Sequence, residues 1–466
     1  MAFFQVRSLA GSVWPPIPVP EASQVWAAYR ELDRTQWLTP PELEELQFRQ
    51  LRALLMHCFH EVPYYRRLLT EAGMGGRPIK SFSDFRKLPI LTRELYQTHF
   101  AELQARSLPP GMTAAGEAYT SGTNGVPLKV MKTNRVTLWW NAFFLRDLEW
   151  SGLDPRGRLA AIRILAMSPE QLPAALEGST VPFWNKHLDP IIESGPSYGM
   201  DIRQDPRRQL QWLKRIHPDY LLSMPTNLEL LADLLQESGE RIPALKAIQA
   251  YAEPLPAVVR QRIESGFGVP VYNVYSATEA GYIASPCPTG GGLHVHSENV
   301  IVEVLDADDR PCLPGQTGRL VFTTLHNFLT PFVRYEILDE VTLALEPCRC
   351  GRGLPAWTHV EGRRYPSLHL PDGRRKSSMG TVLGIRKVGA SRQFQIVQRA
   401  PDHVVVRVVP DRTWTAANAE QIRQVVRDEL ESPISVDVEE RAYLDRPSGG
   451  KLRLVVVENE GRAVPR

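Results

Sequence analysis

The sequence is poor in cysteine and has no surplus of charge of either sign, and each shortage excludes a class of protein. Five cysteines spread over 466 residues are too few for a disulfide framework, which predicts a reducing compartment. Lys and Arg number 54 and Asp and Glu number 52, so bulk charge does not predict a nucleic-acid partner. Basic runs with interleaved aromatic residues, which would change that expectation, are also missing.

Long hydrophobic runs are missing as well. No apolar stretch approaches the roughly 18 residues that a membrane helix needs. The first twenty residues are interrupted by Arg7 and by prolines, so they lack the apolar core of a signal peptide. We therefore expect a soluble, cytoplasmic protein without a membrane partner.

The spacing of apolar residues in the first 300 positions predicts an α/β fold. Helical periodicity extends over residues 41–72, with a break near Pro63, and further helices are predicted between short apolar runs. Parallel strands need crossover connections of about this length. The pattern therefore predicts a mainly parallel sheet flanked by helices, with strands at 220–222, 248–251 and 269–274 and helices at 208–216, 227–236 and 257–266.

The pattern changes twice in the rest of the chain. Alternating runs at 300–305, 318–324 and 340–345 predict an antiparallel subdomain packed beside the parallel sheet. The last hundred residues predict a small α+β domain, with strands at 394–398, 404–409 and 434–438 and a helix at 416–430. We place the domain boundary so that residues 1–361 form a large N-terminal domain and residues 362–466 a small C-terminal one.

A glycine-rich segment at residues 119–129 predicts a phosphate-binding loop. Gly122 and Gly125 permit backbone conformations that a side chain forbids, and Ser121, Thr123 and the free backbone N–H groups can bind phosphate oxygens. The spacing is not that of the P-loop of nucleotide triphosphatases, and a polar glycine-rich turn is often only a turn. On its own, the loop therefore does not identify a nucleotide site.

Four further segments follow in order: Tyr-Ser-Ala-Thr-Glu-Ala-Gly at 275–281, Arg-Tyr-Glu-Ile-Leu-Asp at 334–339, Gly362-Arg363, and Pro-Ser-Gly-Gly-Lys at 447–451. With the glycine-rich loop, they resemble the motifs of the adenylate-forming superfamily of acyl-CoA ligases. The segments at 51–65 and 81–96 are similar to the N-terminal helical region of its branch of phenylacetate-CoA ligases and capsule-biosynthesis proteins. The resemblance covers almost the whole chain and departs from the motifs at Asn124 and Ser276.

The resemblance implies an enzyme that uses ATP to convert a carboxylic acid to an acyl-adenylate with release of pyrophosphate, and then forms a thioester with coenzyme A. It implies that Lys451 supplies positive charge in adenylation, and that Glu279, with Thr278 beside it, holds Mg²⁺ against the phosphates. A solvated lysine and a surface glutamate are the alternatives.

The resemblance also assigns residues to the nucleotide and to a moving domain. Asp339 would bind both ribose hydroxyls, placed at the end of a strand, and Tyr275 would stack on adenine. Glu253 lies in a segment that resembles the lining of the base and acyl pocket, although packing alone would also explain it. Gly362 and Arg363 would form the hinge of the mobile C-terminal domain.

A second group of residues predicts a structural zinc site. Cys287 and His294 come from one segment and Cys348 and Cys350 from another, which gives the closed ligand set that zinc prefers. Buried thiols beside a core histidine are the alternative. Some members of the ligase branch carry such a site, whereas Cys58 and Cys312 have the surroundings of core and loop residues.

Two other functions stay open at this point. The acyl group could pass to an amine or a carrier protein instead of coenzyme A. Alternatively, the chain could have a ligase fold without catalytic activity and serve as a zinc-containing binding or scaffold protein. The presence of Lys451, Glu279 and Asp339 together argues against an inactive enzyme, which usually loses one of them. An aromatic-rich stretch at 139–144, with Trp150 and Trp184, suggests a pocket for an aromatic or hydrophobic acid, but such stretches are also common in cores. The sequence leaves open which acid is used and whether the chain forms a homodimer.

Overall fold

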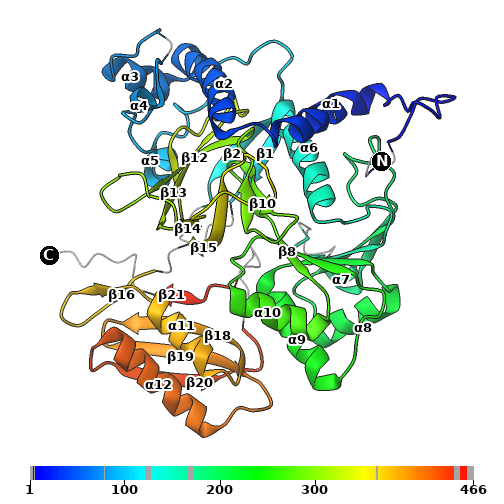
Figure 1. The fold of residues 1–466 in the computed structure, drawn as a ribbon. Helices are drawn as coiled ribbons and strands as arrows, with labels where there is room; N and C mark the ends of the chain where they lie inside the picture. The colour runs from blue at the N-terminus through cyan, green and yellow to red at the C-terminus, as the bar shows by residue number, and fades with distance from the viewer. Residues whose placement is uncertain are drawn as a thin grey trace.

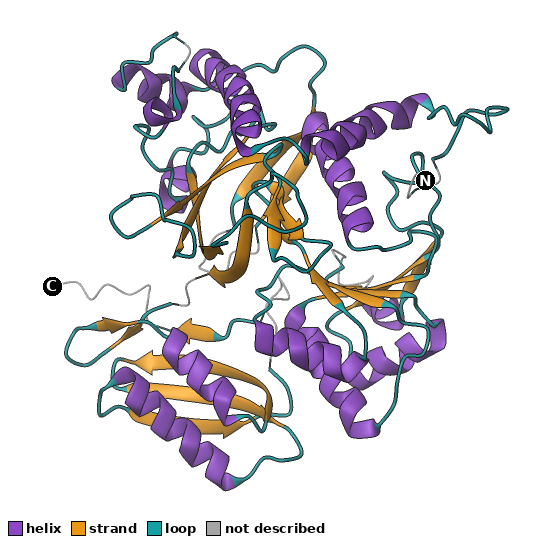
Figure 2. Cartoon of the chain, in the orientation of Figure 1, coloured by secondary structure: helices purple, strands orange, loops and turns teal. Residues whose placement is uncertain are grey.

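The computed structural model describes residue 4 and residues 6–77, 79–120, 127–165, 172–363, 366–444 and 452–458. Two large sheets and a separate C-terminal unit organise these residues, as Figure 1 shows in chain order and Figure 2 by type of element. The α/β class predicted from the sequence is confirmed. Among the described residues, no helix combines the length and the apolarity required to cross a membrane.

The first large sheet has six strands in the order β4-β5-β3-β6-β7-β8. The five strands from β5 to β8 pair in parallel, and β4 adds an antiparallel edge. Apolar side chains bury both faces, because α8, α9 and α10 pack on one and α1 and α6 on the other. The elements are β3 (Leu159–Arg163), β4 (Ser179–Val181), β5 (Ser197–Asp201), β6 (Tyr220–Ser223), β7 (Ala247–Ala250), β8 (Val271–Asn273), α1 (Pro20–Thr35), α6 (Asn134–Trp150), α7 (Leu172–Glu177), α8 (Pro206–Ile216), α9 (Pro225–Ser238) and α10 (Ala257–Phe267).

Helix boundaries in this layer follow from local chemistry. Helices α8 and α9 begin with a proline, whose fixed φ suits the first helical turn. Helices α9 and α10 end at Gly239 and Gly268, which adopt left-handed φ values of 68° and 73°. These signals explain why the predicted helices at 208–216, 227–236 and 257–266 agree with the observed ones to within two residues.

The second large sheet has seven antiparallel strands in the order β12-β13-β14-β15-β11-β10-β9. Its buried face packs against the N-terminal helices and forms the largest apolar cluster of the described residues. The elements are β9 (Tyr275–Ala277), β10 (Gly281–Pro286), β11 (Leu293–Val295), β12 (Val300–Leu305), β13 (Thr317–Thr324), β14 (Tyr335–Leu343), β15 (Ala356–Arg363), α2 (Pro40–Glu61), α3 (Pro63–Glu71), α4 (Phe82–Phe85) and α5 (Arg93–Thr98). A hairpin of β1 (Ala114–Tyr119) and β2 (Lys129–Thr133) forms a separate two-stranded sheet.

The C-terminal unit is a four-stranded sheet in the order β20-β19-β18-β21 with two helices packed on it. Figure 1 shows it next to α9 and α10. Arg392 pairs with Glu237 at 2.5 Å, and the Gln393 amide donates to the Thr226 carbonyl at 3.1 Å. The elements are β16 (Leu368–His369), β17 (Arg375–Lys376), α11 (Met379–Val388), β18 (Ser391–Ala400), β19 (His403–Pro410), α12 (Ala416–Leu430), β20 (Ser435–Glu440) and β21 (Val455–Val457).

One predicted strand is displaced. The strand expected at 340–345 is β14, which begins at Tyr335, so Asp339 lies inside a strand and not at its end. The pairing with β13 shifts register between Glu336 and Glu340, and Leu338 has a positive φ of 69°. A bulge of this kind does not interrupt the strand, but it changes the direction of the side chains around it. The predicted domain boundary at residue 362 falls within β15 and stays a prediction.

Candidate active site and metal centre

Thr278 and Glu279 lie in the turn that joins β9 to β10, directly after the edge of the parallel sheet. The Glu279 side chain is buried, and only 5% of its surface is exposed. Lys132 of β2 lies close enough to Glu279 to interact with its charge. Burial lowers the pKa of the Lys132 ammonium group, and the negative charge of Glu279 opposes that shift. A buried carboxylate beside a partly buried cation is typical of a functional site. Nothing in the sequence marked Lys132, which is an ordinary strand residue in the pattern.

The structure brings together Tyr275 and Asp339, which are 64 residues apart in the chain. The Tyr275 hydroxyl donates a hydrogen bond to the Asp339 carboxylate, which is 7% exposed. Asp339 also lies opposite Arg363 in the pairing of β14 with β15. Three of the predicted site residues therefore lie together at one place in the antiparallel sheet, although nothing is described of the Arg363 side chain.

Glu253 has a contact that the sequence did not predict. Its carboxylate accepts hydrogen bonds from the Thr226 backbone N–H at 2.9 Å and from the Thr226 hydroxyl at 3.1 Å. Thr226 belongs to the first turn of α9, where the helix dipole favours a negative charge. Next to Glu253, Pro254 packs closely on Gly362, where a Cβ atom would lie 2.2 Å from the proline Cγ. The predicted hinge therefore contacts the segment predicted to line the base pocket.

Several predicted site residues lie outside the described residues: Ser121, Gly122, Thr123, Gly125 and Lys451. The strands that flank the glycine-rich segment are described, and Tyr119 of β1 lies opposite Lys129 of β2. Their predicted roles stay predictions.

A cleft with about 330 Å³ of empty space, part of it open to solvent, lies between α6 and the antiparallel sheet. Glu279 is in its wall, and three aromatic residues predicted from the sequence, Trp139, Trp140 and Phe143, line it. Two other predicted aromatic residues lie elsewhere: Trp150 packs against His294 and His296, and Trp184 packs against Tyr220. The cleft also contains residues that sequence reasoning missed, among them Tyr282, Asn299, His326 and Asn327.

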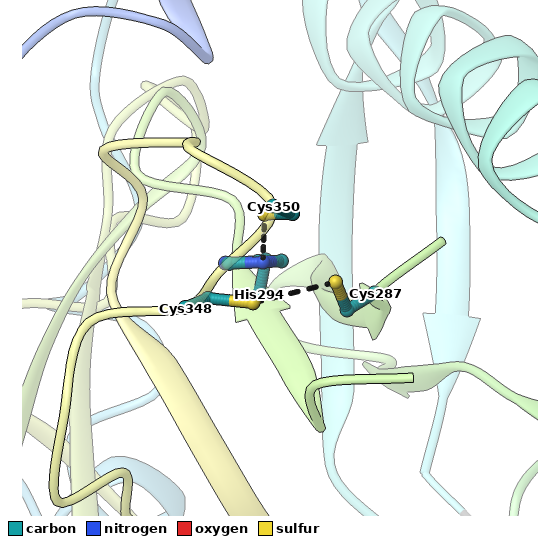
Figure 3. A group of neighbouring side chains, drawn as sticks. All are labelled: Cys287, His294, Cys348 and Cys350. Atoms are coloured by element: carbon teal, nitrogen blue, oxygen red, sulfur yellow. Dashed lines mark hydrogen bonds between the residues drawn. The ribbon is translucent and has the colours of Figure 1, made fainter. Parts of the chain in front are cut away.

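The four residues predicted to bind zinc form one cluster, shown in Figure 3. Their ligand atoms all lie within 4.8 Å of one another. The Cys287 and Cys348 sulfurs are 3.5 Å apart, and His294 Nε2 is 3.2 Å from the Cys350 sulfur. Four ligands at about 2.0–2.3 Å from one ion lie at similar distances from one another. The three thiols and one imidazole therefore fit a tetrahedral metal ion.

The surroundings of the cluster favour metal binding. His294 Nδ1 is 3.1 Å from the Leu354 carbonyl, which can only accept, so Nδ1 carries the proton and Nε2 keeps a lone pair for a metal. Burial raises the pKa of Cys287, but hydrogen bonds from Thr289 and from the Gly291 backbone outweigh it and lower the pKa to about 7. A Cβ atom at Gly291 would lie 2.5 Å from the Cys348 sulfur, so only glycine allows the loop to approach the thiols.

Comparisons with known proteins agree with this arrangement. The profile of the family described as AMP-binding enzyme matches residues 82–330. The phenylacetate-coenzyme A ligase of Thermus thermophilus is 28% identical over 337 residues, which cover 71% of each chain. The Escherichia coli phenylacetate-coenzyme A ligase is 25% identical and covers 67% of this chain and 70% of its own.

A solved structure shows the same fold. The 2-hydroxyisobutyryl-CoA ligase in its postadenylation state superimposes with a TM-score of 0.70 at 20% identity, covering 92% of each chain. These findings confirm the prediction of an adenylate-forming ligase that resembles phenylacetate-coenzyme A ligases. The family profile spans more than half of the 466 residues, and the chain belongs to the family of AMP-binding enzymes.

Proposed function

We propose that the protein uses ATP to activate a carboxylic acid as an acyl-adenylate and then transfers the acyl group to coenzyme A. The observation that carries this proposal is the placement of Glu279 in the wall of the aromatic cleft. A group that can act on phosphates through a metal thereby lies beside the aromatic side chains of α6. The relatives named phenylacetate-coenzyme A ligase support coenzyme A as the acceptor.

In the first step, a carboxylate oxygen attacks the α-phosphorus of ATP and the bond to pyrophosphate breaks. In the second, the thiolate of coenzyme A attacks the acyl carbon and AMP leaves. Both reactants of the first step are negatively charged, so positive charge and oriented donors lower the barrier more than a general base does. We assign this charge to Lys451 and to the glycine-rich loop.

Asp339 and Tyr275 would bind the nucleoside. The Tyr275 hydroxyl holds the Asp339 carboxylate in place, and this bond leaves the Tyr275 ring fixed at the edge of the antiparallel sheet. We assign Asp339 to the ribose hydroxyls and the Tyr275 ring to adenine. We assign Glu253, whose carboxylate is bound to the first turn of α9, to the lining of the base pocket.

Glu279 fits a magnesium site, because its buried carboxylate supplies the hard oxygen ligand that Mg²⁺ prefers. When bound, Mg²⁺ would neutralise charge on the phosphates during transfer. Thr278 precedes Glu279 in the same turn, where its hydroxyl can donate to a phosphate oxygen.

Pyrophosphate release tests the function directly. The protein is incubated with ATP and a panel of aromatic and aliphatic acids, with and without coenzyme A, and thioesters are identified by mass spectrometry. We expect pyrophosphate only when an acid is present, and a thioester only when coenzyme A is added. Release with acid but no thioester would show that the acceptor is an amine or a carrier protein. No release with any acid would contradict the proposal.

We also propose that Cys287, His294, Cys348 and Cys350 bind one structural zinc ion. Metal analysis of protein purified without chelators should give about one zinc per chain. Cys287→Ser should lose this zinc and lower the unfolding temperature, because a structural metal stabilises only the folded state. Cys312→Ser is the matched control, since Cys312 is a partly buried thiol outside the cluster. Metal-free wild type with an unchanged unfolding temperature in Cys287→Ser would contradict the assignment.

A further inference from the structure

The C-terminal unit is attached to both ends of α9 by charged and polar side chains (Figure 1). At the last turn of the helix, the Arg392 guanidinium of β18 donates to both carboxylate oxygens of Glu237, at 2.5 and 2.7 Å. Only 19% and 22% of these two side chains are exposed, so salt screens the pair less than it screens a surface pair. At the first turn, the Gln393 amide donates to the carbonyl of Thr226 at 3.1 Å.

A second carboxylate of α9, that of Glu229, is shared between the two domains. It lies 3.5 Å from Arg386 of α11 and 3.4 Å from Arg262 of α10. Burial raises the pKa of the Glu229 carboxyl, and the charge of Arg386 is the strongest influence that opposes this shift. Arg262 also donates to both carboxylate oxygens of Asp233, at 2.7 and 2.8 Å. The acidic face of α9 therefore keeps an arginine of its own domain if the C-terminal unit moves away.

The interface between the C-terminal unit and α9 is polar and loosely packed. Among the described residues, the apolar cluster of the C-terminal unit includes none from the large domain. A gap with about 600 Å³ of empty space, part of it open to solvent, lies between α9, α10 and the start of β18. Arg262, Arg386 and Arg392 line this gap, so it is polar and has room for water. Polar interfaces of this kind allow domains to separate, whereas large apolar ones do not.

Strand β18 also holds the residues that follow Lys451 in the chain. The Ile396 backbone N–H donates to the carbonyl of Leu454 at 2.7 Å, and the Gln395 amide donates to the carbonyl of Arg453 at 2.9 Å. Arg392 belongs to the same strand. A change in its pair with α9 is therefore transmitted to residues 452–454, which adjoin Lys451 in the sequence.

We propose that Glu229 and Glu237 are positioning residues for adenylation. Through Arg386 and Arg392, they hold the C-terminal unit in the orientation that brings Lys451 to the nucleotide. The proposal rests on the proposed function, which assigns the positive charge of Lys451 to that step.

The contact at the first turn of α9 indicates why this orientation serves adenylation. Thr226 accepts from Gln393 through its carbonyl, and its backbone N–H and hydroxyl bind Glu253. Glu253 lies in the segment predicted to line the base pocket, so the C-terminal unit is attached beside the predicted nucleotide site. Coenzyme A needs access to the acyl carbon in the second step, and we expect the unit to leave α9 before the thioester forms.

Reversal of one charged pair tests the attachment without any substrate. Hydrogen exchange of the full-length protein is followed by mass spectrometry in peptides that cover α9 and β18. Arg392→Glu brings two carboxylates together, so both peptides should lose part of their protection. Adding Glu237→Arg to Arg392→Glu restores an attraction and should restore the protection. Unchanged protection in Arg392→Glu would overturn the proposal.

The two half-reactions test the positioning role. Pyrophosphate release is measured with an acid that the protein activates, and thioester formation is measured separately from the purified acyl-adenylate and coenzyme A. Arg392→Glu should lower the ratio of the first rate to the second by about tenfold, because a repulsion replaces an attraction. The variant that combines Glu237→Arg with Arg392→Glu should recover most of this ratio.

Arg399→Glu is the matched control. Arg399 lies on the same strand as Arg392 and also pairs with a glutamate, but its partner Glu439 belongs to the C-terminal unit itself, at 3.4 Å. The same charge reversal there should leave both the protection of α9 and the ratio of the two rates unchanged.

The outcomes separate the two proposals. Equal loss of both rates in Arg392→Glu, or a ratio that the reversed pair does not restore, would overturn the positioning role and leave the ligase function intact. Failure of every acid to release pyrophosphate would overturn the proposed function and this inference with it.

Discussion

We predict that Asp147 lowers the stability of the protein as the pH rises. Its side chain on α6 is completely buried and accepts a hydrogen bond from the Gln249 amide at 2.6 Å. Burial raises the pKa of the Asp147 carboxyl from 3.8 to about 7. Because the folded pKa lies above the unfolded one, the stabilising contribution of the protonated form is complete below pH 4 and is lost as the pH rises through 7. At 1.36 kcal/mol per pH unit, the whole loss is about 4 kcal/mol, of which about 3 kcal/mol falls between pH 5 and pH 8.

Asp147→Asn removes this titration and keeps an oxygen for Gln249. The free energy of unfolding of wild type and variant is measured in urea at pH 5 and pH 8, by tryptophan fluorescence. The variant should gain about 3 kcal/mol relative to wild type between the two pH values. The difference in unfolding free energy between the two proteins cancels the contribution of nearby groups such as His296. Burial lowers the pKa of His296, so that its contribution makes the folded state more stable as the pH rises, opposite to that of Asp147.

Glu298→Gln is the control, at a partly buried carboxyl that pairs with Arg146. Burial raises the pKa of Glu298, but the charge and hydrogen bonds of Arg146 outweigh burial, so the pKa lies below 4.5. Its stabilising effect is therefore present at both pH 5 and pH 8, and the variant should lose similar stability at each. If the difference between Asp147→Asn and wild type does not change with pH, or changes with the opposite sign, the reasoning about Asp147 is refuted.

Four further predictions concern the predicted site residues and hinge. Lys451→Ala should slow pyrophosphate release by orders of magnitude with little change in unfolding temperature; a normal rate would remove the lysine from adenylation. Gly362→Ala should destabilise the protein more than Gly373→Ala does. Both glycines have a positive φ, but only at Gly362 would the added Cβ atom collide with a neighbour, the Cγ atom of Pro254 at 2.2 Å. Gly362→Pro should also impair thioester formation more than adenylation, and equal loss of both rates would argue against a hinge there. Tyr275→Phe should raise the KM for ATP severalfold by releasing Asp339; an unchanged KM would contradict the assignment of Asp339 to the ribose.

The fold was predictable where one local signal dominates. Prolines at the first turn of α8 and α9 and glycines after α9 and α10 define the helices, and the apolar runs between them can only be buried strands. The cluster of Cys287, His294, Cys348 and Cys350 was predictable for a similar reason, since three thiols and an imidazole in two short segments are a small and specific set. The predicted position of Asp339 at a strand end was wrong, because β14 continues through a bulge that depends on its pairing with β13.

The aromatic cleft was only partly predictable. Trp139, Trp140 and Phe143 are neighbours in sequence and share one helix, so their pattern is visible. His326 follows β13, and what makes it distinctive is its stack on Trp139 and its bond to the Glu298 carbonyl, which are contacts between segments far apart in the chain. The role of Glu253 at the start of α9 was hidden in the same way.

The cluster of Cys287, His294, Cys348 and Cys350 also determines which changes in chain length this part of the fold can accept. Cys348 and Cys350 lie in the connection between β14 and β15, and they contact Cys287 and His294 on the neighbouring strands. The connection is therefore held at a fixed point, and the exposed residues 345–347 before it can absorb an insertion or deletion. A residue gained or lost within β15 that slips its pairing with β14 by one would turn every following side chain to the other face of the sheet. Such a change would replace Arg363 as the partner of Asp339, so related chains should vary in length before the cysteines and keep a constant length after them.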